Sequence, residues 1–325
     1  MESGSGVRLT ICIPTVDRIG FLGQTIDSAL AQTYSPIEII VSDNSGDANY
    51  AEAVDRLVGD RPAASIHVIR QPHKLTATRH FNVLVDAGSG QLWLFLPDDD
   101  LLRPDFAATA VRILEEEPDV GFISTSHGII SGDGARDDAA ATRYEETYGR
   151  ATRPRGLIAY DAIFGLALNG FFTLQATVFR RDVIRRFGLD PSVEEVPDFD
   201  LFLRIGASRL AINGYYVPER LADYRLHGAQ SAFDKVRWHA AMVCSLERIR
   251  DVRPSDRARH ARRLASAQVA LAWARAEEGN RSGAARELLR AVRTEPTRWR
   301  AYMGLVEILL PVTAAWLRRT LRRTA

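Results

Sequence analysis

Three consecutive acids, Asp98, Asp99 and Asp100, follow directly on a short apolar run at residues 92–96. The run is too short for a helix and is apolar on both faces, which predicts a buried strand. Adjacent carboxylates repel one another, so they need a divalent cation, a cationic ligand or water. Ligands of open α/β sheets bind beyond the carboxyl ends of strands, where these acids would lie. We interpret the triplet as a metal and phosphate site; the alternative is a solvated acidic turn that caps the helix beginning near Pro104.

Asp198 and His227, much further along the chain, could take part in the same chemistry. Pro197 suits the first turn of a helix, and Asp198 would lie in that turn, where the helix dipole favours its anionic form. Asp200 and Arg204 are four residues apart and are expected to pair on that helix. His227 follows a short strand, and by itself such a histidine is more often structural or exposed than a ligand.

The elements that must position these residues alternate along the first part of the chain. Strands are expected at residues 7–14, 37–41, 65–70, 92–96 and 120–124, and helices at 19–32, 50–58, 76–87 and 105–117. This alternation predicts a doubly wound, mostly parallel sheet of the α/β class. The first, second and fourth strands end in polar turns that carry Thr15 and Asp17, Asp43, and the triplet. Such turns would meet at one edge of the sheet.

The rest of the chain changes from mixed structure to helices. Residues 132–155 are polar and rich in Gly, Asp and Arg, which predicts a long loop that is either a lid or disordered. Further helices are expected at 160–168, 181–187, 265–278, 282–292 and 299–310, and strands at 171–179, 215–217 and 221–226. The last helices loosely follow a tetratricopeptide-like pair. We therefore predict a catalytic domain, residues 1–235, and an all-helical C-terminal extension, residues 236–325, that acts as a buttress, a partner surface or a membrane-surface contact.

Charge is distributed unevenly along the 325 residues. The net charge is +1, so the chain as a whole has no bulk attraction to nucleic acid, and no nucleic-acid partner is expected. Residues 246–325 hold 18 Arg, no Lys and 8 acids, so their net charge is +10 (18 − 8). This basic tail could contact an anionic membrane surface or an acidic partner, or it could be a solvated basic face. Residues 316–323 are amphipathic and could lie on a membrane or dock on their own domain.

The cysteines and the apolar runs indicate the compartment. Of the two cysteines, Cys12 belongs to an apolar strand pattern, and neither Cys12 nor Cys244 suggests a disulfide framework or a zinc site. The first residues do not form a signal peptide, and no apolar run reaches 18 residues. We expect a cytoplasmic protein, with peripheral contact at the inner face of the cell membrane as a further option.

Several motifs together resemble those of the family 2 glycosyltransferases, inverting enzymes of the GT-A fold that use nucleotide-sugar donors. The resemblance covers residues 7–231 and rests on order and spacing, since each motif alone is weak. The motifs are Ile11-Cys12-Ile13-Pro14-Thr15 with Arg18, Ile39-Ile40-Val41-Ser42-Asp43-Asn44-Ser45, Asn82, Gly90, the triplet with Leu101-Leu102-Arg103-Pro104-Asp105, Pro197-Asp198-Phe199-Asp200-Leu201-Phe202-Leu203-Arg204, and Tyr224-Arg225-Leu226-His227 with Ser231. The resemblance strengthens the interpretation of the triplet and of His227 as a metal site.

The resemblance implies a role for each matching residue. The nucleotide base and ribose are expected at Thr15, Asp17 and Asp43, with Arg18, Arg79 and Asn82 also in the donor site. Asp99 is expected to be the main metal ligand, with Asp98 near ribose and metal, Asp100 toward the donor sugar and metal, and His227 completing the shell of a Mn²⁺ or Mg²⁺ ion. Asp198 matches the catalytic base. Pro97 stands where the family commonly has an acid, which leaves the division of roles within the triplet open. Pro197 stands where the family often has Glu, so the acidic pair at the position of the base is reduced to Asp198.

The implied reaction moves a sugar from a UDP-, dTDP- or GDP-sugar to the hydroxyl of a sugar or lipid-linked acceptor. One carboxylate acting directly on the acceptor predicts inversion at the anomeric carbon. The resemblance suggests bacterial surface polysaccharide or glycoconjugate synthesis, and the sequence is compatible with a homo-oligomer. One alternative is a nucleotidyltransferase, although the loop after the first strand is poor in Gly. The other is a non-catalytic GT-A-like scaffold that presents its helical tail to a partner.

Overall fold

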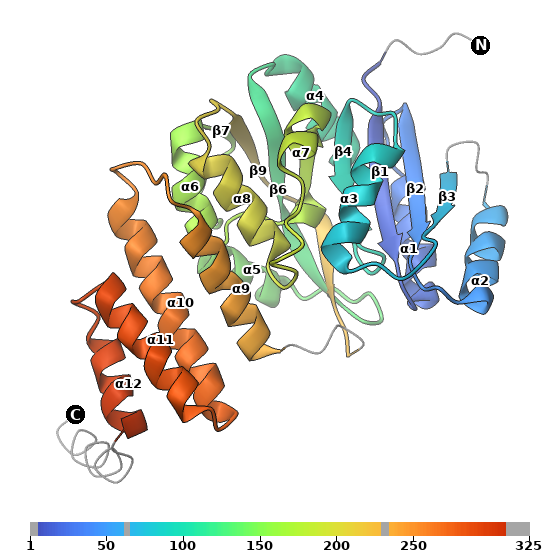
Figure 1. Ribbon diagram of the computed structural model, residues 1–325. Coiled ribbons are helices and arrows are strands. Elements are labelled where there is room, and N and C mark those ends of the chain that lie inside the picture. Colours follow the sequence, from blue (N-terminus) through green and yellow to red (C-terminus); the bar gives the residue numbers. More distant parts are fainter. Residues whose placement is uncertain (1–5, 62–65, 229–233, 310–325) are drawn as a thin grey trace. The chain divides into compact units, whose positions relative to one another are not determined.

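The computed structural model describes residues 6–61, 66–228 and 234–309 of the chain (Figure 1). Ser231 and the predicted amphipathic helix at 316–323 lie outside the described residues. The chain divides into two compact units, residues 1–230 and 231–325. The boundary expected from the sequence was five residues later, between 235 and 236.

The first unit is built around a nine-stranded sheet with the order β3-β2-β1-β4-β8-β6-β9-β5, in which β7 also pairs with β9. The strands are β1 (Leu9–Thr15), β2 (Ile37–Asp43), β3 (Ile66–Arg70), β4 (Leu92–Phe95), β5 (Leu101–Leu102), β6 (Val120–Ser131), β7 (Gly156–Ile158), β8 (Thr177–Arg180) and β9 (Asn213–Leu226). β1 to β4 pair in parallel, and β8 is antiparallel to both β4 and β6, so β6 and β9 keep the common direction. The mostly parallel, doubly wound sheet predicted from the sequence is confirmed.

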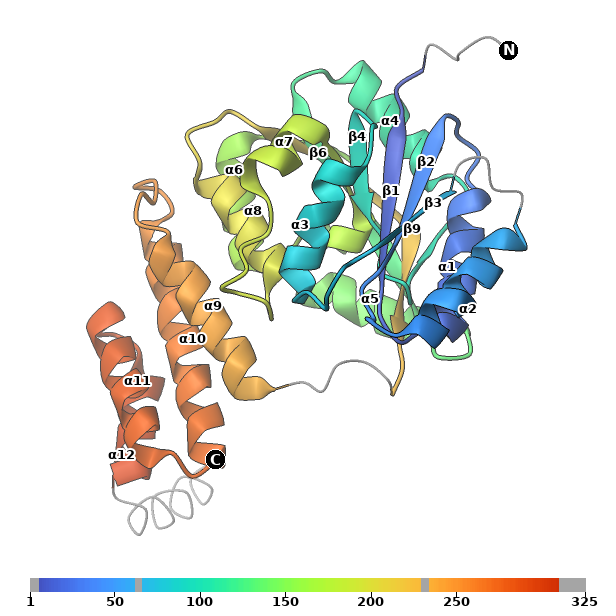
Figure 2. The ribbon, with the colours of Figure 1, turned by 45° about the vertical axis from the view of Figure 1, so that its right-hand side comes forward.

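Helices cover both faces of this sheet because both faces are apolar. Leu9, Ile11 and Ile13 of β1 pack into one core cluster with α1 and α4. The thiol of Cys12 points the other way and contacts the carbonyl of Leu84 in α3, and Figure 2 shows α3 and α7 along one face of the sheet. The helices of the unit are α1 (Ile19–Leu30), α2 (Ala48–Gly59), α3 (Ala77–Ala87), α4 (Phe106–Glu116), α5 (Asp138–Thr147), α6 (Tyr160–Leu168), α7 (Arg181–Phe187) and α8 (Pro197–Ala207). Every β1 side chain is therefore buried.

Three expectations for the second half of this unit were wrong. Residues 132–155 are not a plain loop, because β6 continues to Ser131 and α5 follows, capped by Asp137. The strand expected at 171–179 is a 3₁₀ turn followed by the short β8. The two strands expected at 215–217 and 221–226 are one strand, β9, which follows β6 through register shifts.

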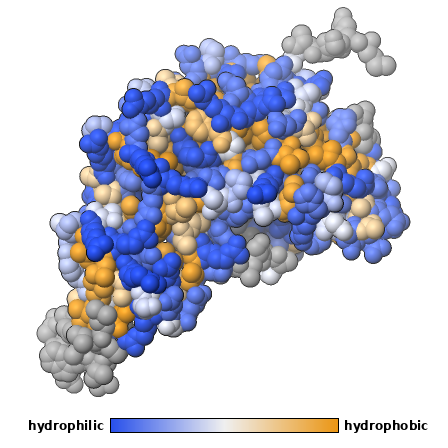
Figure 3. Space-filling view, viewed as in Figure 1, coloured by the Kyte–Doolittle hydropathy of each residue, from blue (hydrophilic) through white to orange (hydrophobic). Residues whose placement is uncertain are grey.

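Every regular element in the described residues of the second unit is a helix, as predicted. Its helices are α9 (Lys235–Arg248), α10 (Arg257–Glu277), α11 (Arg281–Thr294) and α12 (Trp299–Leu309). The core between α10, α11 and α12 consists mainly of small residues, such as Ala272, Ala284 and Ala291, which let the helix backbones approach closely. No helix in the described part of the chain is long and apolar enough to cross a membrane. The face seen in Figure 3 is mostly hydrophilic, with smaller apolar areas between.

We predict that Gly206→Ala destabilises the first unit, because α8 approaches α6 too closely for a side chain. A Cβ at Gly206 would lie 2.5 Å from the backbone nitrogen of Phe164. Overpacking of this kind costs about 1–3 kcal/mol of unfolding free energy, which urea unfolding would measure. Gly20→Ala in α1 is the control, since a Cβ there meets nothing within 4 Å. Equal stability of the two variants would contradict close packing of α6 and α8.

Candidate active site

The predicted convergence of strand ends is present at one edge of the sheet. Thr15 ends β1 directly opposite Asp43, which ends β2. The Thr15 hydroxyl donates a hydrogen bond to Oδ2 of Asp98, at 2.6 Å, and the backbone N–H of Val16 donates to the same oxygen at 3.3 Å. The polar residues that follow or end the first, second and fourth strands therefore lie at the same edge of the sheet.

Arg18 contacts the first two acids of the triplet. Its guanidinium lies 2.5 Å from Oδ1 of Asp98 and donates a hydrogen bond to Oδ2 of Asp99 at 3.0 Å. The Tyr50 hydroxyl accepts a hydrogen bond from the Arg18 backbone N–H and also bonds the Thr15 hydroxyl, so α2 supports this contact. Burial raises the pKa of the Asp98 carboxyl, and the positive charge of Arg18 opposes that rise. The charge of the two carboxylates is therefore compensated in part by a side chain of the protein itself.

Asp99 also contacts His227, which arrives from the end of β9. The ring nitrogen Nε2 of His227 lies 3.0 Å from Oδ2 of Asp99, and the ring of Phe21 packs on the imidazole with 4.6 Å between centroids. Two neighbouring ligands of one octahedral ion, each about 2.1 Å from it, are separated by about 3.0 Å. The donor pair formed by Asp99 and His227 therefore fits a divalent cation such as Mn²⁺, which accepts both carboxylate and imidazole.

The four predicted metal ligands do not form one cluster. Asp98 contacts Arg18 and Thr15, and Asp100 turns toward β9. Within residues 6–61, 66–228 and 234–309, no three His, Cys, Asp or Glu side chains are grouped to hold a metal ion. A cation held by Asp99 and His227 would thus take its remaining ligands from elsewhere.

Asp100 is buried, and only one of its two carboxylate oxygens has a hydrogen-bond partner. Its Oδ1 accepts a hydrogen bond from the backbone N–H of Arg225 at 2.9 Å, whereas its Oδ2 is buried without a hydrogen-bond partner. Burial raises the pKa of the Asp100 carboxyl well above its usual range, and the charge of Asp99 adds to the rise. Asp100 therefore favours its protonated form in the metal-free protein.

Arg225 was not singled out as a site residue in the sequence, yet it fixes the backbone of the triplet. Its fully buried guanidinium donates to the carbonyl of Asp99 at 2.7 Å and to the side chain of Gln24 at 2.9 Å. It also lies over the ring of Phe21, 4.9 Å from the centroid. The signal for this role is an arginine at an inward position of the strand that precedes His227.

The predicted nucleotide residues lie in different environments. The carboxylate of Asp43 accepts a hydrogen bond from the backbone N–H of Ser45 at 2.8 Å, which shapes the turn after β2. Nearby, His80 bonds the Ser42 hydroxyl at 2.7 Å, and burial lowers the pKa of this histidine to about 4. Asp17 has a positive φ of 57° and an exposed side chain. This turn conformation directs the chain from β1 into α1.

Two other predicted donor residues do not join the triplet. Arg79 is exposed on α3. Both polar atoms of the Asn82 amide bind the backbone of Leu189, at 2.7 and 2.8 Å. Asn82 therefore attaches the segment after α7 to α3, and its amide uses one donor and one acceptor for this purpose.

Asp198 belongs to a second cluster. It lies in the first turn of α8, where its Oδ1 accepts a hydrogen bond from the N–H of Phe199 at 2.8 Å. Burial raises the pKa of its carboxyl, and backbone N–H groups and the charge of Arg150 oppose that rise. Asp200 and Arg204 form the expected ion pair at 2.6 Å, and Arg204 also binds the carbonyl of Gly188, so the helix is held in place.

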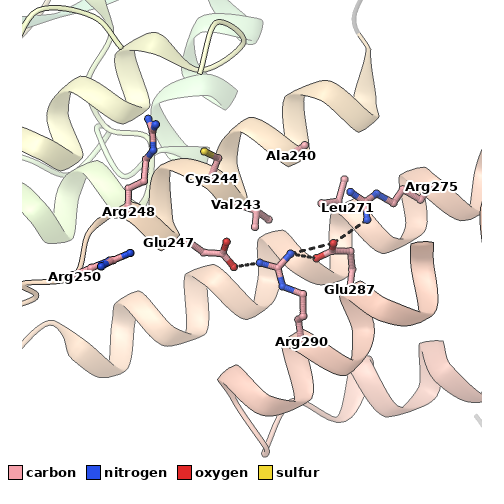
Figure 4. A pocket seen from close by; sticks show the side chains of 10 residues that line it. All are labelled: Ala240, Val243, Cys244, Glu247, Arg248, Arg250, Leu271, Arg275, Glu287 and Arg290. Carbon is pink, nitrogen blue, oxygen red and sulfur yellow. Dashed lines mark hydrogen bonds and ion pairs between the residues drawn. The ribbon is translucent and has the colours of Figure 1, made fainter. Parts of the chain in front are cut away.

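The helical unit contains a hollow of about 520 Å³ between α9, α10 and α11 (Figure 4). Arg290 lies between Glu247 and Glu287, and Arg275 pairs with Glu287 at 2.8 Å. These charges neutralise one another, and no predicted catalytic residue lines the hollow. The strand-end cluster is therefore the better candidate for an active site.

Comparison with known proteins agrees with this choice. The family described as "Glycosyl transferase family 2" matches residues 10–187, which is more than half of the chain. An uncharacterised glycosyltransferase of Nostoc sp. is 25% identical over 230 residues, which make up 69% of this chain and 66% of that protein. The chondroitin synthase of Pasteurella multocida is 22% identical over 202 residues, or 61% of this chain and 18% of the synthase. The chain thus spans about two thirds of the first relative and less than a fifth of the second.

Solved structures resemble the chain over nearly its whole length. The mannosyltransferase PcManGT of Pyrobaculum calidifontis, solved with GDP-Man and Mn²⁺, has a TM-score of 0.60 at 18% identity, covering 99% of this chain and 83% of that one. TarS of S. aureus, in complex with UDP, has a TM-score of 0.65 at 11% identity, covering 98% and 92%. At these identities the likeness concerns the fold.

We predict that Asp100→Asn stabilises the metal-free protein at pH 8. Because burial raises the folded-state pKa of Asp100, its ionisation opposes folding from the unfolded value of about 3.9 upward. The isosteric amide removes this opposition, so its advantage should be about 1 kcal/mol or more at pH 8 and vanish near pH 4. Urea unfolding with EDTA at both pH values measures it, with the exposed Asp86→Asn as control. A less stable Asp100→Asn protein at pH 8 would contradict the buried charge.

Proposed function

The chain belongs to glycosyl transferase family 2 and has its GT-A fold, and from this premise we propose that it transfers a sugar from a nucleoside diphosphate sugar to an acceptor hydroxyl. The observation that carries the proposal is the contact between Asp99 and His227 at the end of β4. It joins a carboxylate and an imidazole, two groups that can bind a cation, near the sheet edge where Thr15 and Asp43 end their strands. Ligands of open α/β sheets bind at such edges.

The donor half of the site is proposed to hold the nucleotide and the diphosphate. Asp43 offers a carboxylate acceptor to a base N–H, a role that acceptor-only oxygens suit. Thr15 and Asp17 lie at the neighbouring turn between β1 and α1, and Arg18 supplies a guanidinium that matches phosphate as well as carboxylate. The support from neighbours is that PcManGT was crystallised with GDP-Man and TarS with UDP or UDP-GlcNAc.

Asp99 and His227 are the proposed ligands of a Mn²⁺ or Mg²⁺ ion. Such an ion neutralises the negative charge that develops on a departing diphosphate. Asp98 and Asp100 would lie beside these ligands without binding the ion in the present arrangement. Arg18 pairs with Asp98, and the backbone N–H of Arg225 binds Asp100. The Mn²⁺ in the PcManGT structure supports a divalent ion in this fold.

Asp198 is the proposed general base. A carboxylate whose pKa is raised by burial accepts a proton more readily than a solvated one. If Asp198 takes the proton of the acceptor hydroxyl and that oxygen attacks the anomeric carbon directly, the configuration inverts. No covalent enzyme intermediate is needed in this scheme.

The acceptor is proposed to be a sugar or a lipid-linked sugar, in the synthesis of a bacterial surface polysaccharide or glycoconjugate. The similarity to a chondroitin synthase supports a polysaccharide product. The basic helical unit supports a peripheral contact with an anionic membrane, because residues 234–309 hold 16 Lys and Arg against 9 acids.

We predict that Asp198→Asn spares donor binding and lowers transfer at least ~100-fold, because general-base help is worth roughly 10²–10⁴-fold. Single-turnover transfer and calorimetry of the nucleotide sugar measure the two effects separately. Asp161→Asn, which changes an exposed acid on α6, should leave both unchanged. Turnover near normal in Asp198→Asn would remove this residue from the mechanism.

A thermal-shift screen of UDP-, dTDP- and GDP-sugars, with and without Mn²⁺, tests the proposed function itself. A ligand at about 100 times its dissociation constant adds ~2.7 kcal/mol to the stability of the folded protein. We expect one nucleotide class to stabilise the wild type only with Mn²⁺, and Asp99→Ala to lose this response, while the surface variant Asp86→Ala keeps it. Tight binding that EDTA does not weaken would refute the metal proposal, and no binding of any nucleotide sugar would favour the scaffold alternative.

A further inference from the structure

One oxygen of the proposed metal site, Oδ2 of Asp99, is contacted from two directions. Nε2 of His227 lies 3.0 Å from it, and Nη1 of Arg18 donates a hydrogen bond to the same oxygen, also at 3.0 Å. The other terminal nitrogen of the guanidinium, Nη2, lies 2.5 Å from Oδ1 of Asp98. Because an arginine stays protonated in proteins, the oxygen that would bind a metal ion has a permanent positive charge beside it.

This guanidinium and a divalent ion compete for the same carboxylates. Each takes up carboxylate lone pairs, and the lone pairs of Asp99 Oδ2 are already shared between Arg18 and His227. The two cations also repel one another, with twice the energy of two unit charges at the same separation. A metal ion therefore binds Asp99 and His227 more weakly while Arg18 keeps its present place.

The guanidinium is the partner that can leave, because the carboxylates are held from behind. The Thr15 hydroxyl donates to Asp98 at 2.6 Å, and the guanidinium of Arg225 donates to the carbonyl of Asp99 at 2.7 Å. The side chains of Asp98 and Asp99 are 0% and 10% exposed, whereas that of Arg18 is 30% exposed. Release of the contact would thus move Arg18 into water and leave both carboxylates in position.

The ion pair between Arg18 and Asp98 leaves two buried polar atoms unsatisfied. Among the described residues, Nε of Arg18 and Oδ1 of Asp98 have no hydrogen-bond partner, although Oδ1 lies beside the guanidinium. Unsatisfied buried polar atoms cost free energy, so the contact depends on charge more than on hydrogen bonds. A carboxylate oxygen in this state is a suitable ligand for a hard divalent cation.

We propose that Arg18 is a competitor built into the metal site, which admits the divalent ion only when the guanidinium has moved away from Asp98 and Asp99. The inference rests on the proposed metal site at Asp99 and His227 and adds a control of its loading. A diphosphate offers the displaced guanidinium a bidentate partner. Donor and metal therefore favour the binding of one another, and this coupling is reciprocal.

The test is the affinity of the full chain for Mn²⁺ alone, without nucleotide, at pH 8, measured from the EPR signal of free Mn²⁺. A site that is open in a tenth of the molecules or fewer binds at least about tenfold more weakly than one that is always open. Arg18→Gln should therefore bind Mn²⁺ at least about tenfold more tightly than the wild type. If Arg18→Gln does not fold, Arg18→Lys takes its place, since its single nitrogen lacks the fork that bridges both carboxylates, and a smaller gain is expected.

Arg61→Gln is the matched control, because Arg61 also pairs with a carboxylate of α1, that of Asp27, at 2.7 Å. Its Mn²⁺ affinity should equal that of the wild type. Asp99→Ala added to Arg18→Gln should abolish the gain. Equal Mn²⁺ affinity in the wild type and a folded Arg18 variant would overturn the inference, provided that Asp99→Ala weakens binding in both. Mn²⁺ binding that Asp99→Ala leaves unchanged would instead refute the proposed metal site, so the two failures are distinguishable.

Discussion

The structure depends on the compensation of carboxylates that are buried at the ends of strands. Asp98, Asp99 and Asp100 are 0%, 7% and 1% exposed, and three such charges in sequence cannot remain ionised without partners. Arg18 pairs with Asp98 and Asp99, while Arg225 donates hydrogen bonds from its guanidinium to the Asp99 carbonyl and from its backbone N–H to Asp100. The sheet order brings these partners together, because β1 pairs with β4, and β9 runs along β5, which directly follows the triplet.

Much of this arrangement follows from the sequence. Strand ends are recognisable by the change from apolar to polar residues, and parallel strands bring such ends to one edge, so Thr15, Asp43 and the triplet could be placed together in advance. Asp200 and Arg204 could be paired because a local spacing of four residues suffices. His227 could be placed near the triplet only through the family motifs, since nothing local connects it with Asp99 across 128 residues of sequence.

The features that the sequence did not reveal depend on long-range partners. α5 has few apolar residues, and it is held by Arg220 of β9, which binds Glu145 and Asp138. Its polar composition is what made residues 132–155 resemble a loop. Arg150 and Arg225 were missed for a related reason: an arginine is normally exposed, and its burial is decided by the aromatic rings and carbonyls that other segments bring to it. Asn82 shows the converse, since its partner is the backbone of Leu189, which no motif specifies.

The two groups of carboxylates differ in the partners that the fold gives them, and the difference fits the roles proposed for them. Arg18 contacts Asp98 and Asp99, and its charge opposes the rise that burial causes in the pKa of Asp98. Under the proposed function, a divalent ion would take up the same carboxylate oxygens and leave the guanidinium to bind phosphate. Asp198 is instead bonded by a backbone N–H, and burial raises the pKa of its carboxyl. In the proposed mechanism this environment suits a general base, because a contact ion pair would lower the affinity of the carboxylate for a proton.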